Sequence, residues 1–252
     1  MGPAASRRRF LRALLGAVLL AACRPVAPDL SWERVRASGR LRVALDPSYP
    51  PLSDLDPTGE LVGFEPDLCR RLAAELSLRP EFVLDSIEVV TDLVLTGQAE
   101  LAAGLNPGPE HKREFQFTSP YIDVGYFFVR SAEGRSERLG FEAAGEAEGV
   151  AREAARRRGL EPVPFGSARE LARALAAGEV GAAVLNYVAA RQALSLNPKL
   201  LIESTPLIPR PLALLLRADA RALYDRVEGA LQRLKTAGTL GALESRWLGG
   251  PA

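Results

Sequence analysis

Apolar and polar residues follow two periods that alternate along this chain. Apolar side chains fall at every second position over 40–46, which is typical of a half-buried strand. Over 65–78 leucines recur at every fourth position, which predicts a helix with one apolar face. The same alternation continues with a strand at 80–85, a helix at 86–97 and a strand at 99–105. Strands that alternate with helices of this length predict parallel βαβ units and an α/β fold.

The pattern starts again in the second half of the chain. Ser167 and Glu170 form a capping box ahead of a predicted helix that ends at Gly178, and a buried strand follows at 180–186. The stretches 95–105 and 176–186 share one order: a helix end, a glycine and a strand of small residues. We therefore predict two α/β lobes of similar architecture.

Polar residues follow the predicted strands of both lobes. Open α/β sheets bind ligands beyond the carboxyl ends of their strands. Two such lobes facing each other would place Asp46, Asn106 and Asn186 around one cleft.

The first 22 residues are predicted to be a signal peptide. Four arginines in Ser6–Arg12 precede an apolar run, Ala13–Ala22, that is too short to span a bilayer as a helix. The sequence LAAC ending at Cys23 resembles a bacterial lipobox, which implies a lipidated Cys23 at the mature N-terminus. An ordinary secretory signal with an incidental cysteine is the alternative. The segment also resembles a twin-arginine signal, which leaves the export route open.

Composition narrows the classes of partner and chemistry. Without the first 22 residues the chain has 28 basic and 31 acidic residues, a net charge of −3, which gives no reason to expect a nucleic-acid partner. The remaining cysteine, Cys69, lies among leucines at helical spacing and is predicted to be a buried packing residue. With one histidine in the chain, we expect no metal site, no cofactor and no disulfide.

Four motifs in order carry a resemblance to a known family. They are LRVALDPSYPPL, GELVGFEPDLCRRLAAEL, GPEHKREFQFTSPY and AGTLGALESRW. The chain resembles the extracytoplasmic solute-binding proteins of amino-acid ABC importers (bacterial solute-binding protein family 3) from about Leu41 to Trp247. The resemblance implies a two-lobed periplasmic-binding-protein fold of type II, with two crossover strands and hinge closure over a small ligand.

The resemblance also implies boundaries. We expect residues 23–40 to hold the lipidated cysteine and a tether. Residues 41–122 with 212–252 would form lobe 1, and residues 123–211 would form lobe 2.

Several ligand contacts are implied by matching positions. Asp46 stands where the family has an acid after the first strand, and Tyr49 matches an aromatic that packs on the ligand. Ala103, Gly104 and Asn106 lie at the end of the third predicted strand and are expected at the same site. The alternative roles are a strand-end cap for Asp46 and a packed loop aromatic for Tyr49.

Three positions depart from the family pattern. His111 stands where an arginine usually binds the ligand's α-carboxylate, and Asn186 stands where an aspartate usually binds the α-amino group. Ser86 or Ile87 replaces a second aromatic wall. These changes make an unmodified α-amino acid less assured than a less charged polar solute or an amino-acid derivative. If His111 binds an anion, affinity should rise as the pH falls through about 6.5; the other interpretation is a merely solvated histidine.

Binding without catalysis is the expected activity. The chain has no HExxH, GxSxG or glycine-rich phosphate loop. An alternative is an enzyme on the same fold, like a periplasmic dehydratase of aromatic amino-acid biosynthesis, with His111, Asp46 or Glu142 as the acid. Sensory and cell-wall proteins with this fold need further modules and are a weaker alternative. We expect a monomer on the extracytoplasmic face of the cytoplasmic membrane or in the periplasm, with a small-molecule ligand and an ABC permease as partners.

Overall fold

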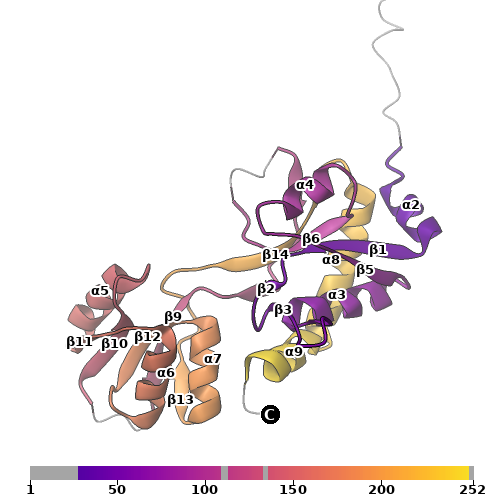
Figure 1. Cartoon of the computed structure of the whole chain (residues 1–252). Coiled ribbons are helices and arrows are strands. Elements are labelled where there is room, and N and C mark those ends of the chain that lie inside the picture. The colour runs from indigo at the N-terminus through magenta and orange to yellow at the C-terminus, as the bar shows by residue number, and fades with distance from the viewer. Residues whose placement is uncertain (1–27, 109–112, 133–135, 250–252) are drawn as a thin grey trace, which may run out of the picture.

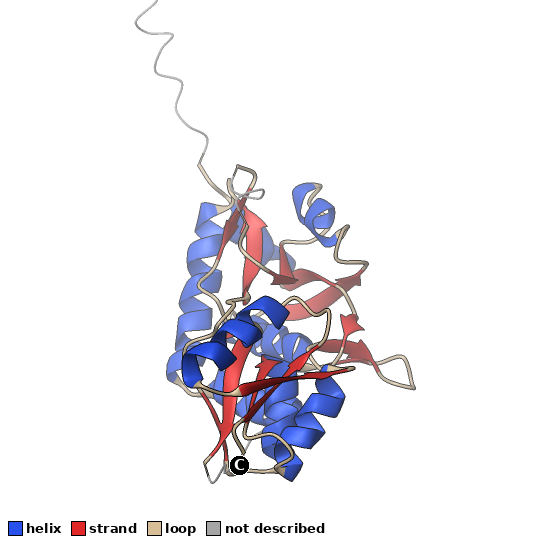
Figure 2. Cartoon of the chain, turned by 90° about the vertical axis from the view of Figure 1, so that its left-hand side faces the viewer, coloured by secondary structure: helices blue, strands red, loops and turns tan. Residues whose placement is uncertain are grey.

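The computed structural model describes residues 28–108, 113–132 and 136–249. Within them the chain forms two α/β lobes, each built on its own sheet, joined by two neighbouring segments (Figure 1). The view turned by 90° shows helices on both sides of the strands (Figure 2). The predicted α/β, two-lobed architecture with two crossovers is confirmed.

Lobe 1 holds three parallel strands followed by antiparallel ones. Apolar side chains alternate across the sheet, so that Val43 packs with one group of helices and Ala44 with the helix on the other face. The strands lie in the order β5 (Arg79–Leu84), β1 (Arg40–Leu45), β6 (Leu101–Leu105), β14 (Pro211–Arg217) and β7 (Phe115–Phe117), and β8 (Ile122–Asp123) also pairs with β14. One face carries α2 (Ser31–Ser38), α3 (Phe64–Glu75), α8 (Arg221–Thr236) and α9 (Thr239–Leu248); the other carries α4 (Val90–Leu95). A small separate sheet joins β2 (Ser48–Tyr49), β3 (Ser53–Leu55) and β4 (Leu61–Val62).

Lobe 2 repeats this arrangement in a continuous part of the chain. Its strands lie in the order β11 (Glu161–Phe165), β10 (Arg138–Glu142), β12 (Ala182–Asn186), β9 (Tyr126–Ser131) and β13 (Leu200–Ile202). The first three are parallel, and β9 is antiparallel to both neighbours. One face is covered by α5 (Glu148–Arg158), and the other by α6 (Ala168–Ala177) and α7 (Tyr187–Leu196).

The two crossovers lie against each other as antiparallel segments. Val124 donates its N–H to the carbonyl of Arg210 at 3.0 Å, and Tyr126 donates to Ile208 at 2.9 Å. Gly125 fits between them because a Cβ there would collide with the carbonyl oxygen of Ile208. A paired crossover of this kind lets the lobes rotate while remaining in register.

Part of the segment 23–40, which was predicted to hold a tether, is packed on lobe 1 in the structure. Ser31–Ser38 form α2, and Val35 in that helix is 5% exposed in the core of lobe 1. Asp29 accepts hydrogen bonds from the backbone N–H groups of Ser31 at 2.8 Å and Ala222 at 2.6 Å, which ties this segment to the start of α8. Residues from Asp29 onward are therefore part of the folded body.

Two properties of the described ranges bear on membrane attachment and on cysteine chemistry. No helix in them is both long and apolar enough to cross a bilayer. Cys69 is fully buried in α3, as predicted, and burial raises the pKa of its thiol. A buried neutral thiol packs as a small apolar side chain.

Candidate functional site

The strand ends place the predicted ligand residues as the sheet rule requires. Asp46 follows β1, Asn106 follows the neighbouring strand β6, and Asn186 ends β12 of lobe 2. Within the described ranges, no hydrogen bond or ion pair joins Asp46, Tyr49 or Asn106 to Asn186. Among the described residues, the predicted ligand residues of one lobe thus make no hydrogen bond or ion pair with those of the other lobe.

Asp46 organises the loop that follows β1. Its Oδ1 accepts hydrogen bonds from the backbone N–H of Ser48 at 2.9 Å and from the Ser48 hydroxyl at 2.6 Å. Its Oδ2 accepts from the N–H of Ile87 at 2.9 Å. A carboxylate with three donors around it is well satisfied without a ligand. This geometry favours the strand-end cap over the ligand contact.

Tyr49 has the opposite character, because its side chain is free to meet a ligand. It lies in β2 and is 55% exposed. Tyr126, at the start of β9 in lobe 2, lies within electrostatic range of it. Burial raises the pKa of Tyr126, and the nearby Glu142 and Tyr49 add to that rise. Tyr49 of lobe 1 and Glu142 of lobe 2 are thus both within electrostatic range of Tyr126.

Ala103 and Gly104 offer only main-chain groups. The Ala103 methyl is buried in the core at 1% exposure. Gly104 has a φ of +83°, and its N–H donates to the hydroxyl of Tyr121 at 2.9 Å. Asn106 donates its side-chain N–H to the carbonyl of Pro211 at 3.0 Å, which fastens the end of β6 to the second crossover.

Glu65 is a buried carboxyl beneath this region that the sequence reasoning did not select. It is 3% exposed, and Tyr121 donates its hydroxyl hydrogen to Glu65 Oε1 at 2.5 Å. Burial raises the pKa of Glu65 to about 7; the hydrogen bond from Tyr121 opposes the rise, and the charge of Asp46 adds to it. The sequence could have indicated a buried acid, because Glu65 lies three residues before Leu68, on the apolar face of the predicted helix.

Asn186 serves two structural elements at once. It ends β12, and its Oδ1 accepts the N–H of Ala189 at 2.9 Å and so caps α7. An aspartate could cap the helix in the same way and still accept from an ammonium group. The amide adds two N–H donors in place of a second acceptor oxygen, which suits a less cationic ligand group. His111 and Cys23 lie outside the described residues.

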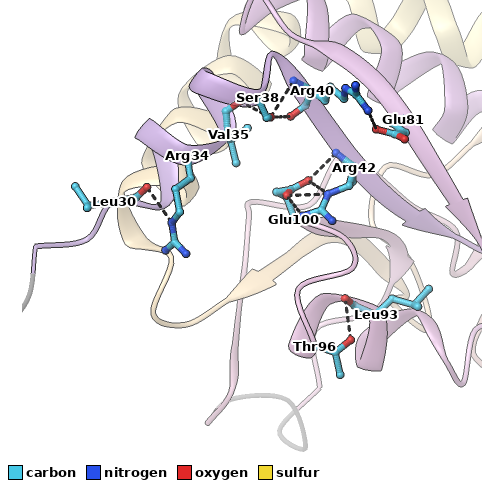
Figure 3. A network of polar contacts seen from close by, with 10 residues as sticks. All are labelled: Leu30, Arg34, Val35, Ser38, Arg40, Arg42, Glu81, Leu93, Thr96 and Glu100. Carbon is cyan, nitrogen blue, oxygen red and sulfur yellow. Dashed lines mark hydrogen bonds and ion pairs between the residues drawn. The ribbon is translucent and has the colours of Figure 1, made fainter.

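None of the predicted ligand residues lines the main hollows of the described structure. One of about 780 Å³ sits at the amino-terminal ends of β1 and β6 in lobe 1. Arg42 and Glu100 line it and form an ion pair at 2.5 Å, and Arg40 faces Glu81 at 3.6 Å (Figure 3). None of the predicted ligand residues lines it. Within the described ranges, no group of three His, Cys, Asp or Glu side chains could hold a metal ion.

Comparison with known proteins decides the family. The model for bacterial extracellular solute-binding proteins, family 3, matches residues 41–250. This chain belongs to family 3. The match covers the four motifs and both lobes, in agreement with the resemblance found in the sequence.

Individual relatives of this family 3 protein are distant. The amino-acid-binding protein AabA of Dichelobacter nodosus is 28% identical over 218 residues, which cover 80% of this chain and 85% of that protein. An ancestral cyclohexadienyl dehydratase has a similar structure, with a TM-score of 0.74, 21% identity and coverage of 88% of this chain and 98% of its own. The L-cystine solute receptor of Neisseria gonorrhoeae, in an unliganded open conformation, has a TM-score of 0.71 at 19% identity and covers 87% and 97%. At these identities the structural likeness shows the fold.

Proposed function

We propose that this protein binds a small polar solute, an amino acid or a derivative of one, between its lobes and delivers it to an ABC permease. The observation that carries the proposal is the match to family 3 over both lobes, and polar residues at the strand ends of each lobe support it. The name of the relative AabA supports an amino-acid-like ligand. Closure about the paired crossovers would bring Tyr49 and Asn186 to the same ligand.

The polar groups favour a ligand with less charge than a free α-amino acid. Asp46 already accepts three hydrogen bonds, and Asn186 presents an amide instead of a carboxylate. An ammonium group would therefore find fewer unengaged acceptors. Exposed Tyr49 and Ile87, which is 38% exposed, provide apolar surface for the body of the ligand. His111 as the group that binds the ligand's anion belongs to this proposal.

The chain is further proposed to be a lipoprotein anchored through Cys23. Its tether would be Arg24 to Pro28, since residues from Asp29 onward are part of the folded body. The family places such proteins outside the cytoplasm, and a lipid anchor would hold this one at the membrane beside its permease. The proposal treats the protein as a monomer.

The test is a thermal-shift panel on the protein from Arg24 onward. Free amino acids, amino-acid derivatives, small organic acids and polyols are added one at a time. A ligand that binds only the folded state raises the free energy of unfolding by about 2.7 kcal/mol at a hundredfold excess over Kd. A free amino acid that raises Tm strongly would show that the site works with Asn186 in place. If no amino acid or derivative raises Tm, the proposed ligand class is wrong.

A catalytic alternative rests on one observation, the structural likeness to an ancestral cyclohexadienyl dehydratase. In this chain Glu142 and Tyr126, which lie within electrostatic range of each other, would supply a carboxyl and a hydroxyl. An enzyme of this kind would consume a cyclohexadienyl carboxylate and release an aromatic product, which an absorbance assay detects. Relatives such as AabA are named for binding, and we therefore propose binding as the function.

A further inference from the structure

One helix of lobe 2 is attached to lobe 1 outside the crossovers. Tyr187, the first residue of α7, donates its hydroxyl hydrogen to Glu244 Oε2 of α9 at 2.8 Å. One turn along α7, Arg191 donates its Nε hydrogen to the carbonyl of Gly249 at 2.8 Å. Figure 1 shows α7 and α9 facing each other below the strands that join the lobes. We call these four residues the α7–α9 latch.

The latch also has an apolar part. The Tyr187 ring and Val188 pack against the core cluster of lobe 1, although both belong to lobe 2. The ring of Phe127 lies 5.4 Å from that of Tyr187, between centroids. Burial and the hydrogen bond to Glu244 raise the pKa of Tyr187 to about 12, so its hydroxyl remains a donor at neutral pH. The contact thus combines buried ring surface with a charge-assisted hydrogen bond.

The same helix begins at a predicted ligand residue. Asn186 caps α7 and is followed directly by Tyr187. The backbone N–H of Tyr187 donates to the carbonyl of Gly125 in the first crossover at 2.9 Å, so this end of α7 lies near the pivot. Arg191 is one turn further along. A rotation of lobe 2 about the crossovers therefore moves Asn186 and the latch together, and it changes the distances between Arg191 and Gly249 most.

A contact that spans two lobes favours the arrangement in which it is made. Here the latch is formed, and the lobes are arranged more like those of the L-cystine receptor in its unliganded open conformation (TM-score 0.71) than like those of an ancestral arginine-binding protein bound to arginine (TM-score 0.52). Binding between the lobes requires a different arrangement, and a ligand can shift that equilibrium only by its differential affinity. The free energy needed to break the latch therefore reduces the free energy of ligand binding, which weakens the apparent affinity.

We propose that Tyr187 and Arg191 of α7, held by Glu244 and Gly249 of lobe 1, stabilise the ligand-free arrangement and so set the apparent affinity for ligand. This inference rests on the proposed function, because it assumes a ligand between the lobes. Tyr187 and Arg191 are positioning residues, which act through the angle between the lobes. Substitutions in the latch should consequently change the apparent affinity for ligand while the residues that touch the ligand stay the same.

The decisive variant is Tyr187→Phe, which removes one hydroxyl and keeps the ring. We expect it to bind about three- to tenfold more tightly than the natural protein, since one hydrogen bond is lost from the ligand-free arrangement alone. Glu244→Ala and Arg191→Met should act in the same direction, and Glu244→Gln should lie nearer the natural protein because it keeps an acceptor. The control is Tyr224→Phe, whose hydroxyl donates to Phe117 within lobe 1 at 3.3 Å.

Affinity is measured by calorimetry with L-arginine, L-glutamine and L-cystine as probes, together with any compound that raises Tm in the panel. A second readout needs no ligand: the distance between spin labels at Arg71→Cys in α3 and Arg169→Cys in α6, measured by pulsed electron resonance. Tyr187→Phe should add a second distance population that Tyr224→Phe lacks. Unchanged or weaker binding in Tyr187→Phe, or a distance distribution identical to the control, would overturn the latch. If no compound binds any variant, the proposed function fails while the distances still decide the latch.

Discussion

At the scale of single residues, two carboxyl groups near the predicted cleft, Asp46 and Glu65, are engaged by hydrogen bonds within lobe 1. Asp46 was predictable as a group at a strand end, but one of the three hydrogen bonds that engage it comes from Ile87, forty-one residues away. Glu65 was marked in the sequence only as an acid on an apolar stripe. Its partner Tyr121 and the contact with Gly104 arise from the packing of three separate segments. The local sequence pattern therefore identifies Asp46 and Glu65 as unusual acids, but it does not predict their hydrogen-bond partners.

Glu65 makes stability depend on pH in a defined direction. Its pKa in the folded state is about 7, above the ordinary value of 4.5, so the folded protein keeps a proton that the unfolded chain releases. The stability that Glu65 contributes is full below pH 4.5 and is lost as the pH rises through 7. Urea denaturation should show the natural protein losing roughly 3 kcal/mol more than Glu65→Gln over this interval.

The comparison between the two proteins isolates this group, because every other titrating side chain is shared. Glutamine keeps an oxygen that can accept the hydrogen bond from Tyr121. Parallel curves of unfolding free energy against pH would show that Glu65 titrates normally.

At the scale of elements, long periodic segments were predictable and short ones were not. The helix over 65–78 and the strand over 99–105 correspond to α3 and β6. The strands β2 to β4 have two or three residues each, too few for a period of apolar positions to be recognised in the sequence. Helix α2 buries only Ser31 and Val35, so its apolar stripe was too sparse to recognise.

The predicted capping box of α6 gives a direct test of an element. Ser167 Oγ accepts the backbone N–H of Glu170 at 3.2 Å, and the Glu170 carboxylate accepts the N–H of Gly166 at 3.2 Å. Ser167→Ala should lower the free energy of unfolding by about 1 kcal/mol, because one helix N–H loses its acceptor. Ser167→Asp retains an acceptor and should stay close to the natural protein. Equal losses in both variants, seen in thermal and urea unfolding, would assign the effect to something other than the cap.

At the scale of the whole molecule, two lobes were predictable from the repeated pattern and their contact was not. Tyr187 and Glu244 are separated by 57 residues, and no local period relates them. The crossovers pair through Val124 with Arg210 and Tyr126 with Ile208, residues more than eighty positions apart. The contacts between the lobes could not be predicted from the sequence, because they join side chains that are far apart along the chain.

The paired crossovers can be tested at Gly125. A Cβ there would meet the backbone of Ile208 and lie 2.8 Å from the nitrogen of Arg210, so the segments must separate. Gly125→Ala should cost about 1–3 kcal/mol in unfolding free energy, as overpacked sites do. Gly229→Ala in α8 is the control, because its nearest atom is a side-chain nitrogen 3.6 Å away and alanine favours a helix. A neutral Gly125→Ala would mean that the crossovers separate freely.

The position of β14 sets the order in which this molecule can be assembled. That strand lies between β6 and β7 in the sheet of lobe 1, yet it follows all of lobe 2 along the chain. While the chain emerges during synthesis or export, lobe 2 has its complete sheet before lobe 1 receives this strand. Until then β6 exposes an open edge that other chains could pair with. The lobe that carries the N-terminus is therefore the last to close, and its maturation waits for the final sixth of the chain.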